Sequence, residues 1–185
     1  GTGLLTLMLA QRYSINIDAV ELEPLCFEQG KINIQASNFA SSISCYQNDI
    51  RTFAPNEKFD FIICNPPFFS EQLEANSAEK NMAKHGTHLN LPTLMNCIKN
   101  LLLATGSYSI LLPFSRKEYW DKLNTSLGFT LQSVLFIKHS KHHPIHFYVG
   151  IYGKHADTLI EDTLFIREEK VHSQKMHALM KEYYL

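Results

Sequence analysis

The sequence predicts an α/β fold whose sheet is mostly parallel, with an antiparallel hairpin near the carboxyl end. Short apolar runs alternate with helical patterns between residues 16 and 127. Polar side chains follow three of these runs directly, and two β-rich runs, 130–138 and 145–152, flank a polar loop. Alternating strands and helices favour a parallel sheet, and such sheets bind their ligands beyond the carboxyl ends of the strands.

The first elements alternate along the chain. Gly1-Thr2-Gly3 runs straight into an apolar helix, with no strand before it, so we infer that the chain is a fragment lacking an N-terminal portion and the first strand. Expected strands follow at 16–22, 43–47 and 59–64, with a helix at 24–36 that begins at Pro24. Residues 69–90 are polar and predict a mobile loop or lid.

The second half continues the same pattern with an antiparallel end. We expect a helix at 91–103 ended by Gly106, a strand at 108–112, and a helix at 116–127 that stops at Gly128. Strands at 130–138 and 145–152 form the hairpin at the sheet edge, and a further strand at 159–167 precedes a helix at 173–184 capped by Ser173. All these elements fit one domain spanning residues 1–185.

Composition is that of an ordinary globular protein. The chain has 185 residues, 45% of them hydrophobic, and a net charge of −1, which gives no general attraction to a polyanion. The four cysteines show no CxxC spacing, as expected for reduced thiols in the cytoplasm. No apolar run is long enough to span a membrane. The local exception in charge is residues 138–146, which are basic and rich in histidine; we interpret them as a solvated hairpin loop and expect no metal.

The most informative motif is Asn65-Pro66-Pro67-Phe68, directly after the apolar run 59–64. Proline fixes its own φ and restricts the residue before it, so the two prolines hold the Asn65 side chain and the Pro66 carbonyl in a rigid corner. Two neighbouring oxygen acceptors suit an exocyclic NH2 group, and Phe68 offers a face on which a planar ring stacks. The motif therefore predicts a site for a planar amine.

Two acids end the preceding strands. Glu21 lies about 20 residues after the Gly-x-Gly turn, where an acid commonly accepts hydrogen bonds from ribose hydroxyls. Asp49 follows the next strand, in position to take an adenine amino group. Either acid alone is as well explained by a solvated strand end or a braced turn. Together with Asn65 they predict a crevice beyond the carboxyl ends of three strands.

This ordered set resembles the class I S-adenosylmethionine-dependent methyltransferases, in the branch that methylates amines and carries an Asn-Pro-Pro-aromatic motif. The resemblance implies a Rossmann-like sheet and S-adenosylmethionine as cofactor. It also implies that Gly1 and Gly3 lie under the methionine part, that Glu21 holds the ribose, and that Asp49 with Ile50 contacts the adenine. Asn65 and Pro66 would orient the amine opposite the methyl group, with Asn65 also beside the cofactor.

The chain is more specifically similar to the bacterial tRNA1(Val) (adenine-37-N6)-methyltransferases. The motifs that carry this are Asn-Pro-Pro-Phe-Phe, Ala83-Lys84-His85, and the ending with Leu164-Phe165-Ile166-Arg167 and Tyr183-Tyr184-Leu185. This similarity implies a tRNA partner bound by its anticodon loop. Pro67, Phe68 and Phe69 would hold the extruded base, and Lys84, His85 and the basic run 138–146 would contact phosphates. Phe68 departs from the tyrosine frequent in the family, which leaves the choice of base open.

Alternatives remain at this level. Guanine-N2 methyltransferases of ribosomal RNA share Asn-Pro-Pro-Phe, and glutamine-N5 methyltransferases of release factors share the fold. A non-catalytic α/β binding module that kept the fold is the third reading. Separately, the structural alternative for Phe68 and Phe69 is to fill the core, and the alternative for Lys84 and His85 is an ordinary exposed face. Nothing in the sequence reports the oligomeric state, and we expect a monomer.

Overall fold

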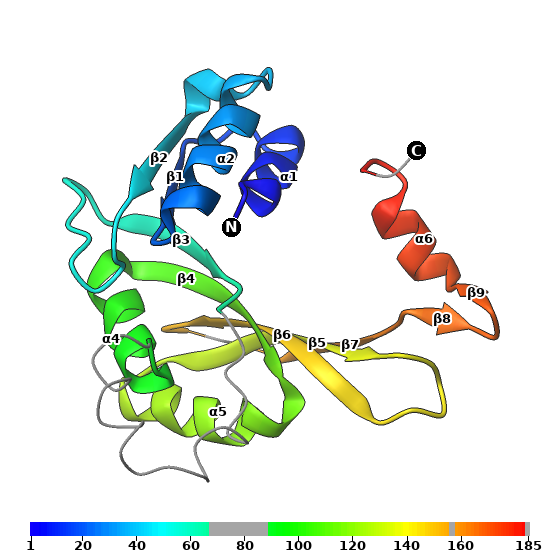
Figure 1. Cartoon of the computed structure of the whole chain (residues 1–185). Helices are drawn as coiled ribbons and strands as arrows, with labels where there is room; N and C mark the ends of the chain where they lie inside the picture. The colour runs from blue at the N-terminus through cyan, green and yellow to red at the C-terminus, as the bar shows by residue number, and fades with distance from the viewer. Residues whose placement is uncertain (67–88, 156–157, 184–185) are drawn as a thin grey trace, which may run out of the picture. The chain divides into compact units, whose positions relative to one another are not determined.

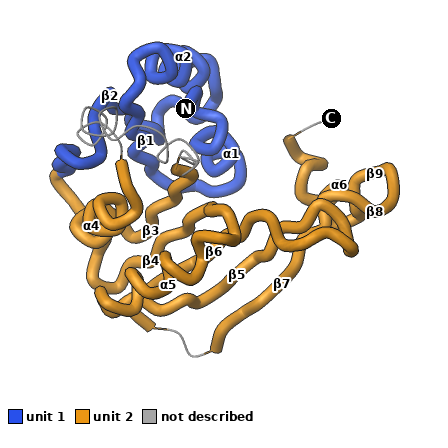
Figure 2. The backbone as a smooth tube through the Cα atoms, turned by 60° about the horizontal axis from the view of Figure 1, so that its bottom comes forward, with its two compact units in different colours: residues 1–55 blue, residues 56–185 orange. Residues whose placement is uncertain are grey.

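The computed structural model describes residues 1–66, 89–155 and 158–183, and the chain divides into two compact units. The first unit comprises residues 1–55 and the second residues 56–185, drawn in blue and orange in Figure 2. Each unit has its own sheet and its own core, and each is described by itself. The prediction of one domain over residues 1–185 stays a prediction.

The first unit is a two-stranded parallel sheet with helices. Its elements are α1 (Leu4–Arg12), β1 (Ile17–Glu21), α2 (Pro24–Gln35), the 3-10 turn η1 (Ala40–Ser42) and β2 (Ile43–Gln47) (Figure 1). The two strands pair in register from Ile17 with Ile43 to Glu21 with Gln47. Ala10, Ile34 and Ile43 form its small buried core. Both strands and α2 match the expected ranges closely, and α2 begins at Pro24 as expected for a proline that has no N–H to satisfy.

The second unit is built on a five-stranded sheet of order β3-β4-β6-β5-β7. Its elements are β3 (Phe59–Cys64), α4 (Leu91–Leu101), β4 (Leu102–Pro113), η3 (Phe114–Arg116), α5 (Lys117–Ser126), β5 (Thr130–Lys138), β6 (Ile145–Gly153), β7 (Ile160–Phe165), β8 (Arg167–Glu168), β9 (Val171–His172) and α6 (Gln174–Met180). β3 runs parallel to β4 and β7 runs parallel to β5, whereas β6 is antiparallel to both β4 and β5. Thus the carboxyl ends of β3, β4, β5 and β7 all lie along one side of the sheet, and this side is the edge to which strand ends are referred below.

These features confirm the predicted fold class. Four of the five strands of the larger sheet run in the same direction, the β1–β2 pair is parallel, and the β5–β6 hairpin is antiparallel with its turn at residues 139–144. The strand expected at 159–167 forms β7, which adds outside β5, and the short β8–β9 hairpin after it was not anticipated. Gly128, with φ of 74°, ends α5, and the Ser173 hydroxyl accepts from the Met176 N–H to cap α6 as predicted.

One boundary was predicted wrongly. The helix expected at 91–103 ends at Leu101, and β4 begins at Leu102, so Gly106 lies inside a strand and ends no helix. The reason is tertiary: a Cβ at Gly106 would lie 2.9 Å from the Asp60 carbonyl oxygen and 2.8 Å from Leu102 Cγ. Glycine is needed here because β3 and β4 approach closely where their register shifts between Phe59 and Phe61.

The core of the second unit carries a row of buried tyrosines. Tyr108 on β4 and Tyr152 on β6 stack at 5.3 Å between ring centroids. The Tyr108 hydroxyl donates to Asn124 Oδ1 at 2.5 Å and the Tyr152 hydroxyl donates to Asp121 Oδ1 at 2.7 Å, both on α5. Burial raises the pKa of both phenols, so they remain neutral donors. These bonds fasten α5 to the middle of the sheet.

Candidate active site

The Gly-x-Gly turn of the first unit packs on a glycine of the neighbouring helix. Gly3 has φ of 83° and stands at the N-cap of α1, where its carbonyl accepts from the Leu7 N–H at 2.9 Å. A Cβ at Gly30 on α2 would lie 3.4 Å from the Gly1 carbonyl oxygen and 3.5 Å from the Gly3 nitrogen. Asn33, one turn further along α2, donates from Nδ2 to the Thr2 carbonyl at 2.9 Å. The backbone of the turn therefore packs directly against the backbone of α2 at Gly30. Gly3 adopts a left-handed conformation that favours glycine.

Glu21 lies beside this turn. Its Oε1 accepts from the Glu23 N–H at 2.7 Å, and its Oε2 contacts the Gly1 nitrogen of the turn. The Glu21 side chain is 21% exposed. An ionised carboxylate has about four lone-pair sites, so two contacts leave acceptor capacity for a hydroxyl group. The structure thus brings Glu21 and the Gly-x-Gly turn together, as a ribose-binding acid would require.

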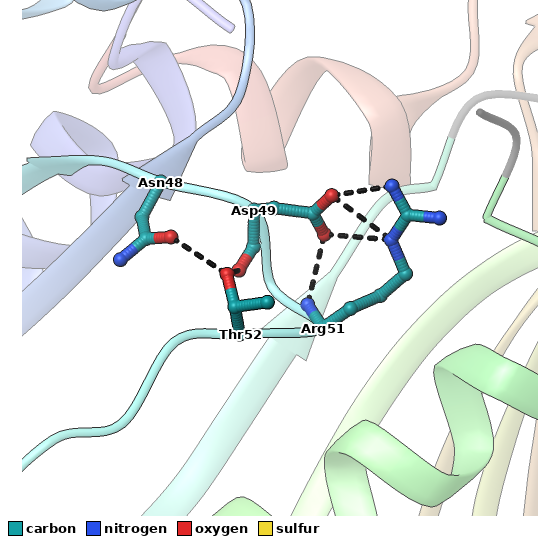
Figure 3. Close-up of polar contacts among 4 residues, drawn as sticks. All are labelled: Asn48, Asp49, Arg51 and Thr52. Atoms are coloured by element: carbon teal, nitrogen blue, oxygen red, sulfur yellow. Dashed lines mark hydrogen bonds and ion pairs between the residues drawn. The ribbon is translucent and has the colours of Figure 1, made fainter. Parts of the chain in front are cut away.

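Asp49 is held by an arginine that the sequence analysis did not single out. The Asp49 carboxylate accepts from the Arg51 backbone N–H at 2.9 Å, from Arg51 Nε at 2.9 and 3.0 Å, and from an Arg51 terminal nitrogen at 2.5 Å (Figure 3). These hydrogen bonds lower the pKa of Asp49 below its usual value. Thr52 closes the same loop by donating its hydroxyl to Asn48 Oδ1 at 3.1 Å.

This loop lies at the same sheet edge as Glu21. Glu21 pairs with Gln47, and the Asn48 N–H donates to the Glu21 carbonyl at 3.0 Å. Ile50, half-buried, follows Asp49 in the turn. The first unit therefore gathers every residue assigned to the cofactor except Asn65, and it presents an ionised carboxylate that Arg51 has already fixed in orientation.

In the second unit, Asn65 and Pro66 directly follow β3 at the edge where β3, β4, β5 and β7 end. Asn65 is exposed, whereas Pro66 is buried. Cys64 just before them packs against the main core, and burial raises the pKa of its thiol to about 12. The residue expected to present its amide is thus the exposed one of the pair, and its role in holding an amine stays a prediction.

The other predicted substrate residues, Pro67, Phe68, Phe69, Lys84 and His85, and the loop expected at 69–90 up to residue 88, lie outside the described residues. Three residues of the site were missed by the sequence analysis: Gly30, Asn33 and Arg51. Gly30 had a detectable signal, because a glycine inside a helix costs about 1 kcal/mol and so suggests a packing reason. Arg51 had a weaker signal in the sequence, namely that it lies two residues after Asp49.

Comparison with known proteins agrees with this geometry. The family model "Methyltransferase small domain" matches residues 1–92, which include the Gly-x-Gly turn, Glu21, Asp49 and Asn65. A protein of Pectobacterium carotovorum named tRNA1(Val) (adenine(37)-N6)-methyltransferase is 34% identical over the whole chain, which covers 77% of that relative. The chain belongs to this methyltransferase family. A Vibrio campbellii relative of the same name is 31% identical, again over the whole chain and 78% of its own length.

Solved structures show the same fold at low identity. An Agrobacterium tumefaciens protein described as a predicted O-methyltransferase matches 98% of this family member and 85% of its own chain, with a TM-score of 0.73 and 15% identity. A TehB-like SAM-dependent methyltransferase of Corynebacterium glutamicum covers 84% of this chain and 76% of its own, with a TM-score of 0.53 and 15% identity. The Rossmann-like methyltransferase fold is thereby shown.

Three further properties concern the described residues. Among them, no three His, Cys, Asp or Glu side chains are arranged to hold a metal ion, the histidines of the β5–β6 turn included. No helix in that part of the chain has the length and hydropathy to cross a membrane. All four cysteines are free thiols.

Proposed function

We propose that this methyltransferase transfers a methyl group from S-adenosylmethionine to the exocyclic N6 of an adenine in tRNA, namely adenine 37 in the anticodon loop of tRNA1(Val). The relatives that match the whole chain carry this activity in their names. The observation that supports it most directly is the exposed Asn65 amide anchored by buried Pro66 at the end of β3.

The first unit fits the cofactor. Because Gly30 has no Cβ, the Gly-x-Gly turn packs closely against α2. The backbone of Gly1 and Gly3 can then face the methionine part of S-adenosylmethionine. Glu21 retains acceptor sites for the ribose hydroxyls, and Asp49 with Ile50 would contact the adenine. When bound, S-adenosylmethionine supplies an electrophilic methyl group on sulfur.

The corner at Asn65 would position the target amine. An exocyclic adenine amine is a weak nucleophile because its lone pair is delocalised into the ring. If Asn65 Oδ1 and the Pro66 carbonyl each accept one N–H, the nitrogen becomes more pyramidal and its lone pair is aimed at the methyl carbon. The methyl group would move from the cofactor sulfur to this nitrogen, and the methylated amine would lose one proton to solvent. Catalysis would consist of positioning and electrostatic stabilisation.

Pro67, Phe68 and Phe69 complete the proposed base site, with Phe68 stacking on the extruded ring. Lys84 and His85 would contact phosphates. A base in a single-stranded loop is cheap to extrude, because little pairing and stacking is lost.

The test is methyl transfer to unmodified tRNA followed by nucleoside analysis. N6-methyladenosine is expected at position 37. N2-methylguanosine would instead identify a guanine-N2 enzyme, and transfer to a release-factor glutamine would identify a glutamine-N5 enzyme. Absence of S-adenosylmethionine binding would favour a non-catalytic module.

Two variants test whether Asn65 orients the target amine. Asn65→Ala should lower kcat by about 100-fold or more, the usual effect of removing one preorganised polar contact, while the S-adenosylmethionine Kd stays within about threefold. Asn100→Ala, which removes an exposed amide from α4, is the matched control and should change neither. Loss of cofactor binding together with activity in Asn65→Ala would mean that Asn65 holds the cofactor and does not orient the amine.

A further inference from the structure

The turn between β5 and β6 is basic and ordered. Residues 138–146 contain Lys138, Lys141 and four histidines, with no acid, in a chain of net charge −1. Lys138 Nζ donates to the Lys141 carbonyl at 3.1 Å, and the His143 N–H donates to the Ser140 carbonyl at 3.1 Å. The rings of His139 and His143 meet edge to face at 4.9 Å. The turn is thus preorganised, with the Lys141 and His142 side chains exposed.

A second segment joins this turn from the far end of the chain. The Ile166 N–H donates to the Lys138 carbonyl and the Arg167 N–H to the His139 carbonyl, each at 2.9 Å. Arg167 then pairs with His172 across the β8–β9 hairpin, while Glu168 pairs with Val171. Because neighbouring residues of a strand face opposite sides, Arg167 and His172 share one face, and Glu168 lies on the other. Figure 1 shows the β5–β6 turn and the β8–β9 hairpin at the same end of the sheet.

We call the six side chains Lys138, Lys141, His142, His143, Arg167 and His172 the basic edge. It lies on the same edge of the second unit as Asn65, since β3, β5 and β7 all end there. Through the ladders Cys64 is level with Val134, so β5 runs four residues, about 13 Å, past the end of β3, and Phe165 at the end of β7 is level with Lys138. With neighbouring strands about 4.8 Å apart, the end of β5 lies about 14 Å and the end of β7 about 19 Å to the side of β3, which gives separations of about 19 Å and 23 Å. Successive phosphates of one strand in a nucleic-acid helix rise by about 3.4 Å, so these separations correspond to roughly six to seven nucleotides.

We propose that the basic edge binds the phosphates of the RNA stem that carries the loop with the target base. In a hairpin RNA with a short loop, phosphates roughly six to seven nucleotides from a base near the end of the loop belong to the stem. The contacts are electrostatic and independent of sequence, so they fix the orientation of the RNA while Asn65 selects the base. This inference rests on the proposed function for the position of the target base, but it concerns residues with no part in methyl transfer.

The experiment compares two charge-matched variants of the purified protein. Lys141→Ala with Arg167→Ala removes two cations from the basic edge. Lys58→Ala with Lys99→Ala removes two exposed lysines at the opposite edge, because Lys58 precedes β3 and Lys99 lies in the last turn of α4 just before β4. Binding is measured by fluorescence anisotropy at several salt concentrations, with the unmodified anticodon stem-loop and with its loop alone as a single strand.

We expect the basic-edge variant to bind the stem-loop about tenfold or more weakly at 0.1 M salt, and the slope of log K against log salt to fall by about 2 in magnitude. Binding of the loop alone should change less than twofold, and the control variant should match wild type in both assays. In methylation assays the variant should raise KM and keep kcat within twofold. Thermal unfolding of both variants should match wild type, because the replaced side chains are exposed.

Two results would overturn the proposal: equal affinities of the two variants for the stem-loop, or equal losses by the basic-edge variant for stem-loop and loop. Failure of the proposed function is a separate result, in which wild-type protein methylates no tRNA although RNA binding is still measured directly.

Discussion

Replacing Gly30 with alanine and with leucine tests whether α2 supports the Gly-x-Gly turn. Three backbone atoms of the turn, the Gly1 oxygen, the Thr2 carbon and the Gly3 nitrogen, lie 3.4 to 3.5 Å from where a Cβ at Gly30 would be. These are ordinary van der Waals distances, so a methyl group fits in contact with the turn. Any larger side chain must displace it, because backbone cannot move aside as a flexible side chain can.

The two substitutions have different expected magnitudes. Alanine is about 0.8–1.0 kcal/mol more favourable than glycine inside a helix, so Gly30→Ala should leave the free energy of unfolding unchanged or raise it by up to about 1 kcal/mol. Leucine has nearly the same helix propensity as alanine, so a difference between the variants reports on space alone. Overpacking at Gly30→Leu should cost about 1–3 kcal/mol relative to alanine.

The assays are urea unfolding and calorimetric titration with S-adenosylmethionine. Gly30→Ala should keep the cofactor Kd within about twofold, whereas Gly30→Leu should weaken binding by about tenfold or more, equivalent to 1.4 kcal/mol. If Gly30→Leu binds S-adenosylmethionine as tightly as Gly30→Ala, the seat on Gly30 does not shape the cofactor site, and the reasoning is refuted.

Three further predictions concern single side chains. Arg51→Ala should raise the pKa of Asp49 toward 3.8 in a carboxyl-carbon NMR titration, and an unchanged pKa would contradict the role given to Arg51. Because the pKa of Asp49 is depressed in the native protein, the Asp49–Arg51 pair stabilises the fold above pH 4. This contribution is lost as the pH falls through the native pKa of Asp49. Tyr108→Phe should lower the free energy of unfolding by about 1–3 kcal/mol in urea, because the Asn124 carbonyl loses its buried donor. Cys64 should resist iodoacetamide at pH 8 in the native protein and react once unfolded, as followed by mass spectrometry, because its thiol has a pKa of about 12.

Much of the fold was predictable from local patterns. The expected strands at 43–47, 59–64 and 130–138 have the observed bounds, because each is an apolar run between polar turns. The error at the end of α4 arose because Leu101, Leu102 and Leu103 continue an apolar pattern that fits a helix or a strand equally well. The strand is favoured by the close approach of Gly106 to Asp60 on the neighbouring strand. The sequence immediately around Gly106 does not include Asp60, so a local pattern could not reveal this contact.

The candidate site was predictable where chemistry follows strand order. Glu21 and Asp49 lie at the shared edge of β1 and β2, as the position of each after its strand required. The engagement of Asp49 by Arg51 was not predictable, because a spacing of two residues brings side chains together only in a particular turn. Asn33 was missed because its partner, the Thr2 carbonyl, is 31 residues away.

The buried tyrosine row has a consequence for strand alignment. Tyr108 is opposite Tyr152 in the β4–β6 ladder, and their hydroxyls reach Asn124 and Asp121 on the helix that covers this face. If β4 slid by one residue against β6, Tyr108 would turn to the other face of the sheet, away from Tyr152, and Asn124 Oδ1 would be left without its donor. Misaligned pairings are thereby penalised during folding. The buried tyrosines thus favour the native register of β4 against β6. That register sets how far Asn65 lies from the ends of the other strands along the same edge.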